Sequence, residues 1–178
     1  MSARDEFRAL RAAVLTVSAR RTAADDDSGD LIRERLRTAG HCVQAQAIHH
    51  GSRAAMTAFL RGWIADPAIE VIISSGGTGI TDSMPEALAP LIDREVPGFA
   101  MLFQQLSYAD IGSSGMLSRA MAALAGGKLV FLIPGSTNAC RLAMDDIIVP
   151  QLDQRTRPCA LAGLLPEPGA GVAAERKA

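Results

Sequence analysis

Short apolar runs alternate with amphipathic segments along this chain. The runs predict strands at residues 12–17, 42–48, 71–75 and 129–133. The third and fourth runs are rich in β-branched residues and bounded by glycine or proline, which is typical of strands covered on both faces. Each of the first, third and fourth strands leads into a polar or glycine-containing loop.

The segments between these strands carry apolar residues at helical spacing. The clearest stripe, at i, i+3, i+4, i+7 and i+8, consists of Met56, Phe59, Leu60, Trp63 and Ile64. Further helices are predicted at residues 29–39, 86–92, 99–106, 117–124 and 137–147. Asp27 or Ser28 is expected to cap the first of these, and Pro150 to stop the last.

The alternation of strands and helices continues without an internal repeat. It predicts an α/β fold with three layers, α/β/α, around a mostly parallel central sheet. A length of 178 residues suits one domain with a substantial core. We assign residues 11–160 to this domain, residues 1–10 to a lead-in, and residues 161–178 to a disordered tail, because its end is rich in proline, glycine and charge.

The third strand runs into Gly76-Gly77-Thr78-Gly79, with Asp82 and Pro85 following. Three glycines in four residues allow a ligand to approach the backbone closely, and amides in such a loop can converge on an anion. Asp82 is placed to hold a metal ion or orient a phosphate. The loop is neither a Walker loop nor a dinucleotide fingerprint, because the following lysine and the glycine spacing are missing. A plain tight turn remains the alternative.

Two other strand ends carry loops of similar character. Ser18-Ala19-Arg20 follows the first strand, and Pro134-Gly135-Ser136-Thr137 follows the fourth. Ligands of such folds bind beyond the carboxyl ends of parallel strands. Because all three loops are expected on that edge, the sequence predicts a site for a phosphate-bearing ligand.

Composition narrows the class of protein. Hydrophobic content of 48% and charged content of 21% indicate a globular chain, and a net charge of -1 argues against nucleic-acid binding. No apolar run reaches the length of a membrane span, and the N-terminus lacks the apolar core of a signal peptide. Cys42, Cys140 and Cys159 show no metal or disulfide spacing, so we expect a cytoplasmic protein with free thiols.

Several of these motifs resemble the molybdopterin-binding domain family, from about Val14 to Cys159. The motifs are Ser75-Gly76-Gly77-Thr78-Gly79, Asp82-Ser83-Met84-Pro85-Glu86-Ala87, Asp93-Arg94-Glu95-Val96-Pro97-Gly98-Phe99, Leu117-Ser118-Arg119 and Pro134-Gly135-Ser136. The resemblance implies a homotrimer or dimer of trimers that meets other proteins of the molybdenum cofactor pathway. It also implies a reaction in which molybdopterin and ATP, with Mg²⁺, give adenylyl-molybdopterin and pyrophosphate.

The resemblance also implies residue roles. Ser75, Gly76, Gly77, Thr78 and Gly79 would cradle the substrate phosphate or pterin. Asp82 would serve catalysis and hold Mg²⁺, and Glu86 would assist at the helix start. The remaining substrate-binding positions would be Ser18, Arg20, Ser118, Arg119, Pro134, Gly135 and Ser136.

Two departures from the family pattern keep a second function open. The loop from Gly79 to Pro85 is shorter than usual, and Gly51 falls where active members carry an aspartate. Loss of a metal-site carboxylate would weaken Mg²⁺-ATP chemistry. The alternatives are therefore a low-activity or non-catalytic molybdopterin-binding scaffold and, more distantly, a general binder of nucleotide phosphates.

Other polar residues receive structural interpretations. His49 and His50 are expected at the surface or an interface rather than in a zinc site, and the acidic run 25–27 is expected to be a solvated helix cap. The helical stripes at residues 99–106 and 116–124 are more apolar than one domain needs, so we expect subunit contacts there.

Overall fold

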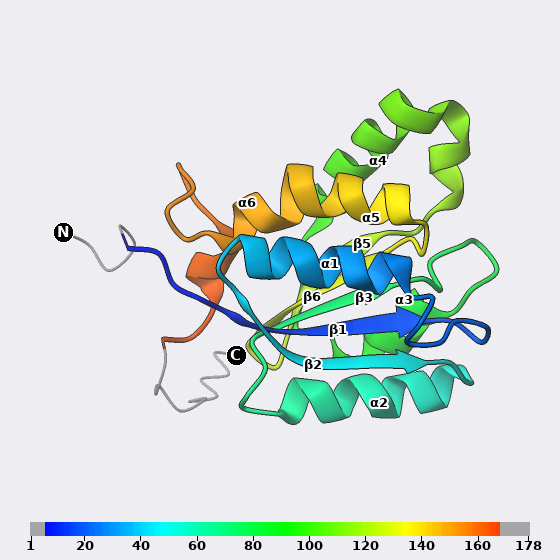
Figure 1. Ribbon diagram of the computed structural model, residues 1–178, viewed down its shortest axis with the longest axis horizontal. Helices are drawn as coiled ribbons and strands as arrows, with labels where there is room; N and C mark the ends of the chain where they lie inside the picture. The colour runs from blue at the N-terminus through cyan, green and yellow to red at the C-terminus, as the bar shows by residue number, and fades with distance from the viewer. Residues whose placement is uncertain (1–5, 168–178) are drawn as a thin grey trace.

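The computed structural model describes residues 6–167 and shows a six-stranded sheet in the order β2-β1-β3-β6-β5-β4 (Figure 1). β2, β1, β3 and β6 are parallel, whereas β5 and β4 pair antiparallel. The strands are β1 Arg11–Val17, β2 Cys42–His49, β3 Val71–Ser75, β4 Arg94–Glu95, β5 Met121–Ala125 and β6 Lys128–Ile133. The mostly parallel sheet predicted from the sequence is confirmed.

Helices cover both faces of the sheet, which confirms the three layers. α1, α4, α5 and α6 lie over one face, and α2 and α3 over the other (Figure 1). Their bounds are α1 Asp27–Thr38, α2 Arg53–Ala65, α3 Met84–Leu88, α4 Pro97–Ile111, α5 Thr137–Ala143 and α6 Val149–Leu152. Shorter 3₁₀ segments are Ala89–Leu91, Gly112–Leu117 and Leu161–Leu164, and a π-helical segment is Met144–Ile148.

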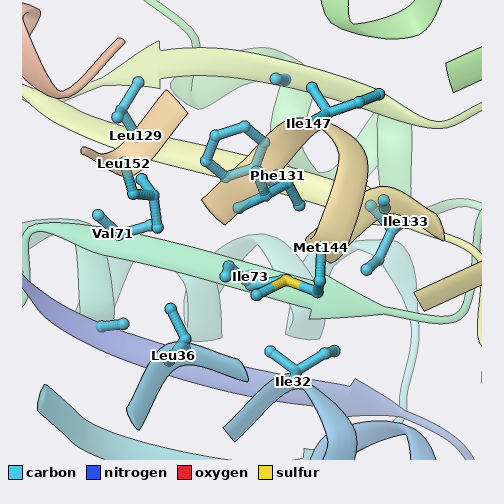
Figure 2. Packing of buried hydrophobic residues seen from close by; sticks show 14 of the residues in the cluster. Ile32, Leu36, Val71, Ile73, Leu129, Phe131, Ile133, Met144, Ile147 and Leu152 are labelled. Carbon is cyan, nitrogen blue, oxygen red and sulfur yellow. The ribbon is translucent and has the colours of Figure 1, made fainter. Parts of the chain in front are cut away.

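The two layers of core follow from the two-residue period of the strands. Val71 and Ile73 of β3 face α1, α5 and the π-helical segment, where they meet Ile32 and Met144 (Figure 2). Ile72 faces the opposite way, into the core formed with α2 and α3. Burial on both faces fixes the register of β3 and so the place where the glycine loop leaves the sheet.

The prediction of a helix at residues 117–124 is wrong. Met121–Ala125 is instead strand β5, and Gly126 and Gly127, with φ of +56° and +74°, turn the chain into β6. Two glycines with positive φ suit a tight hairpin turn. Pairing with β6 and burial of the alanines outweigh the helix propensity of this stretch.

Helix boundaries differ from the sequence prediction in two places. Asp26, rather than Asp27 or Ser28, caps α1, because its side chain accepts from the amide of Gly29. Pro150 does not stop the helical segment that begins at Thr137. A π-helical turn precedes it, and Pro150 then occupies the first turn of α6, where a proline needs no hydrogen-bond donor.

The C-terminal boundary of the domain was predicted too early. Leu161–Leu164 form a 3₁₀ turn, and Ala162 and Leu165 are buried in the core beside α6. Residues 1–5 and 168–178, which include most of the expected tail, lie outside the described residues. In the described range, no helix combines the length and apolar character needed to cross a membrane.

Candidate functional site

The three strand-end loops meet at the carboxyl edge of the parallel strands. The Gly76 amide donates to the carbonyl of Ile133 over 2.9 Å, joining the ends of β3 and β6. A Cβ placed on Gly135 would lie 3.1 Å from Cα of Gly76, and one placed on Gly76 would lie 2.5 Å from the carbonyl oxygen of Val17. The expectation that the loops after β1, β3 and β6 share one edge is therefore confirmed.

The glycine loop is built on two positive φ angles, +92° at Gly76 and +70° at Gly77. Not all of its amides face outward, contrary to the simple cradle expected. The amide of Gly76 is used by Ile133, and that of Gly79 donates to the Asp82 carboxylate over 2.9 Å. In the described chain, the amides of Gly77 and Thr78 make no such bond. These two are therefore the loop donors left for an anion.

Asp82 closes its own loop and remains exposed. Its Oδ2 accepts from the Gly79 amide, and Oδ1 makes no hydrogen bond among the described residues. No group of three or more potential ligands from His, Cys, Asp and Glu occurs among the described residues. A single free carboxylate oxygen fits Mg²⁺, which often takes one or two carboxylates and completes its shell with phosphate oxygens and water.

Arg119 crosses the loop from the other side. Its amide donates to the carbonyl of Thr78 over 2.8 Å, and its Nε donates to the carbonyl of Gly79 over 3.2 Å. The guanidinium also donates to the carbonyl of Asp82 and to the carboxylate of Glu86. That hydrogen bond holds the pKa of Glu86 below its usual value. Arg119 is thus adjacent to the loop, as expected, but it is already neutralised by Glu86.

Ser75 and Ser118 contribute unsatisfied hydroxyl groups near the same loop. The Oγ atoms of both are buried without a hydrogen-bond partner in the described structure. Ser118 also forms an isolated bridge with Gly79, and its carbonyl accepts from Gln104. Buried hydroxyl groups without partners are uncommon, so bound water or ligand atoms are expected beside them.

The loop after β1 departs from the expectation in one residue. Ser18 Oγ accepts from the amides of Arg20 and Arg21 over 3.2 and 3.1 Å, which bends the chain. The Arg20 side chain is exposed, whereas Arg21 donates to the carbonyl of Gly135 over 3.5 Å. Arg21, which the sequence analysis did not single out, therefore connects the loops after β1 and β6. Nothing in two adjacent arginines signalled which one turns inward.

The acidic run was also misjudged, because Asp26 is only 2% exposed. Its carboxylate accepts from the hydroxyl of Thr16 over 2.9 Å, from the Gly29 amide over 3.1 Å and from Arg33 over 3.5 Å. Asp25 and Asp27 are exposed, as expected of a solvated cap. The helix start could have identified Asp26, since Asp two residues before a Ser-Gly pair suits a capping position.

The loop after β6 is held in place by contacts with α1 and α5. Ser28 donates to the carbonyl of Gly135 over 2.9 Å, and Ser136 caps α5 by accepting from Ala139. The Cys140 thiol contacts the carbonyl of Pro134 at 3.2 Å, and burial raises its pKa to about 12. Cys140 is therefore a neutral packing residue beneath the loop and not a nucleophile.

The histidines do not converge with this site. His49 stacks on Phe59 with ring centroids 4.8 Å apart, and His50 is exposed beyond it. His41 accepts from the Leu10 amide at the amino-terminal side of β1. Gly51 is exposed. Because a glycine has no side chain, it cannot supply the carboxylate expected at this position from the family pattern.

Comparison with known proteins defines the class. Residues 13–154 match the family model described as "Probable molybdopterin binding domain". The chain therefore belongs to the molybdopterin-binding domain family.

Particular relatives narrow the comparison. Molybdenum cofactor biosynthesis protein B of Escherichia coli (strain K12) is 50% identical over 156 residues, covering 86% of this chain and 92% of the relative. The protein of that name from Bacillus cereus is 42% identical over 151 residues, covering 83% and 89%. A crystal structure of molybdenum cofactor biosynthesis protein B superposes with a TM-score of 0.80 at 40% identity, covering 84% of this chain and 94% of that one. The tungsten cofactor synthesizing protein MoaB from Pyrococcus furiosus gives a TM-score of 0.69 at 32% identity, covering 79% and 91%.

Proposed function

We propose that this protein acts in molybdenum cofactor biosynthesis by binding molybdopterin and adenylylating it with Mg²⁺-ATP. The observation that carries the proposal is the contact of Gly76 with both Val17 and Gly135, which brings three strand-end loops into one site. The family membership and the names of the relatives support the choice of ligand. Free thiols at Cys42, Cys140 and Cys159 support a cytoplasmic setting.

The proposed reaction asks little covalent chemistry of the protein. A terminal phosphate oxygen of molybdopterin attacks the α-phosphorus of ATP, the bond to the β-phosphate breaks, and pyrophosphate leaves. Such transfers depend on holding two anions in line and neutralising charge. The amides of Gly77 and Thr78 would hold one phosphate, and Asp82 would hold Mg²⁺, which supplies charge neutralisation when bound.

The second candidate is a scaffold that binds molybdopterin without turnover. Gly51 stands where active family members carry an aspartate, and Arg119 is neutralised by Glu86. Both features reduce the charge available to metal and phosphate. Under this alternative, molybdopterin binds at the same site but is not adenylylated.

Release of pyrophosphate from Mg²⁺-ATP in the presence of molybdopterin tests the two candidates. Asp82→Asn is expected to lower turnover at least about 100-fold while pterin binding stays within about threefold, because the neutral amide loses the metal but keeps an acceptor. Asp27→Asn, on the exposed side of the α1 start, is the matched control and should keep the wild-type rate. Tight pterin binding with no pyrophosphate from the wild type would favour the scaffold. Calorimetry showing ATP binding that is indifferent to pterin would favour a general nucleotide binder.

An exposed apolar face supports the proposed homotrimer or dimer of trimers. Met101, at 72% exposure, and Leu102, Tyr108 and Ile111 are exposed on α4, and Met116 and Leu117 are exposed in the 3₁₀ segment that follows. Clustered exposed apolar side chains of this kind mark association surfaces. Light scattering at micromolar concentration is expected to give a trimer or hexamer. A monomer would contradict the proposal, and Leu102→Glu should shift the mass downwards if this face is the contact.

A further inference from the structure

A cavity lies on the other side of β1 from the glycine loop. Its volume is about 460 Å³, and it opens where β1 and β2 end beside the start of α1. Ser18 and Arg21 come from the loop after β1, Arg33 from α1, and Gln46 and His50 from β2 and the loop beyond it. The volume falls within the range of small-molecule sites, and polar and apolar surface contribute about equally to the lining.

Arg21 is the residue in this cavity with an unmet bonding requirement. Its Nη2 donates to the carbonyl of Gly135 over 3.5 Å, but Nη1 is buried without a hydrogen-bond partner among the described residues. The side chain is 31% exposed, and Nη1 lies 4.0 Å from Oδ1 of Asp26. Leaving a charged donor buried without a hydrogen bond is costly, so a ligand atom that accepts from it would be bound favourably.

The other charges around the cavity are already engaged. Asp26 is the one carboxylate among the lining residues, and it accepts from Thr16, Gly29 and Arg33. Arg33 also pairs with Asp30. Ser18 Oγ accepts from two amides, so its own proton can be donated to a ligand. Arg21 and Ser18 are thus two donors available to an anion at this place.

We propose that this cavity is a binding site for a phosphate-bearing ligand and that Arg21 anchors the phosphate. A guanidinium matches phosphate with paired donors, and the volume leaves room for an organic group attached to it. Because Arg21 also reaches Gly135, the bound phosphate lies next to the loop after β6. The inference extends the proposed function by naming a residue and a subsite, and it depends on that function only for the choice of ligands to test.

Calorimetric titration of the full chain with inorganic phosphate, AMP and ATP, without molybdopterin, tests the site. Arg21→Gln is expected to weaken binding of the phosphate-bearing ligand about tenfold or more, because it removes a hydrogen bond to a charged group. Arg61→Gln, exposed on α2, makes the same charge change outside the cavity. Its affinity should stay within about twofold of the wild type, as expected for an exposed charge.

The three ligands separate the sources of the phosphate. AMP binding much more tightly than inorganic phosphate indicates that a nucleotide fills the cavity. Equal affinities indicate that only a phosphate group is recognised, as the phosphate end of a pterin would be. Wild-type affinity in folded Arg21→Gln, or no binding of any of the three by the wild type, would overturn the proposal.

A measurement on the wild-type protein covers the case in which Arg21→Gln does not fold. Phenylglyoxal modifies accessible arginines, and mass spectrometry locates the products. Saturating ATP is expected to protect Arg21 while Arg61 reacts as before. Unchanged modification of Arg21 would contradict the proposal. Since neither experiment requires turnover, a failed adenylylation assay leaves this inference standing, and a failed titration leaves the reaction standing.

Discussion

Arg119 donates from its guanidinium to the carboxylate of Glu86, 33 residues earlier in the chain, with Nη2 3.3 Å from Oε2. The same guanidinium reaches the carbonyls of Gly79 and Asp82, so the pair is part of the closure of the glycine loop. An arginine held in this way lies next to the proposed phosphate site but must exchange partners to bind the phosphate. The pair therefore limits how strongly the loop attracts an anion.

Replacing Glu86 by glutamine should release Arg119 toward the ligand. We expect Glu86→Gln to tighten ATP binding about threefold to tenfold, because the guanidinium regains charge-assisted donors. Glu95→Gln, an exposed residue on β4, makes the same charge change and should leave the affinity unaltered. Calorimetry measures both. Unchanged affinity in Glu86→Gln would show that Arg119 does not reach the ligand.

The same pair gives a titration that can be observed directly. The hydrogen bond from Arg119 lowers the pKa of Glu86 from its ordinary value of 4.5. A carboxylate whose pKa is lowered by folding stabilises the folded state at pH values above its ordinary pKa. This stabilisation is lost as the pH falls through the lowered pKa. Carboxyl chemical shifts in NMR should show the Glu86 pKa rising in Arg119→Gln. Equal values in the two proteins would mean that the pair does not form in solution.

The glycine at position 76 should be irreplaceable for steric reasons. Its φ is +92°, and a Cβ there would lie 2.5 Å from the carbonyl oxygen of Val17. Gly76→Ala is expected to lower the free energy of unfolding by about 1–3 kcal/mol or more and to disturb the loop. At Gly98, in the first turn of α4, a Cβ meets nothing within 4 Å. Gly98→Ala should raise stability by about 0.5–1 kcal/mol, and urea unfolding compares the two variants. Similar effects would contradict the steric argument.

How much of the site the sequence reveals depends on the kind of signal. The strand Val71–Ser75 and the glycine turn after it could be predicted, because burial on both faces and glycine clustering are local properties of the chain. Residues 121–125 could not, since an alanine-rich run has no period that separates helix from strand, and pairing with β6 decides. The Gly126-Gly127 pair was the available sign of a hairpin.

The choice between neighbouring side chains is the other limit. Arg20 and Arg21 have the same chemistry, and only the turn built on Ser18 directs Arg21 toward Gly135. Likewise, the three adjacent aspartates have the same chemistry. Asp26 is distinguished only by its contacts with Thr16, ten residues earlier, and Arg33, seven residues later. Tertiary partners set both outcomes, so residue identity alone left them open.

The buried position of Asp26 leads to a stability prediction. Asp26→Ala removes the cap of α1 and leaves Arg33, whose side chain is 11% exposed, without its buried partner. We expect a loss of about 2–4 kcal/mol in the free energy of unfolding. Asp25→Ala, one residue earlier and exposed, should change stability little. Urea unfolding of both variants makes the comparison, and equal losses would mean that the Asp26 contacts contribute no more than a surface charge.

His41 gives a pH dependence far from the candidate site. Its imidazole is buried, and Nδ1 accepts from the Leu10 amide over 3.2 Å, so that nitrogen must stay unprotonated. Burial lowers the pKa of His41 from its ordinary value of 6.5, although the nearby carboxylates of Asp153 and Glu70 act in the opposite direction. As the pH falls below 6.5, the unfolded chain takes up a proton that the folded chain resists.

The native state should therefore lose stability as the pH falls from the ordinary pKa of histidine toward the lowered pKa of His41. Urea unfolding at about pH 7.5 and about pH 5.5 is expected to show a drop of at most about 1.4 kcal/mol per pH unit from this one group. His41→Gln should flatten that slope even if it lowers stability overall, because the titrating group is gone. His50→Gln, in the exposed loop after β2, should retain the slope. An unchanged slope in His41→Gln would show that other groups cause the pH dependence.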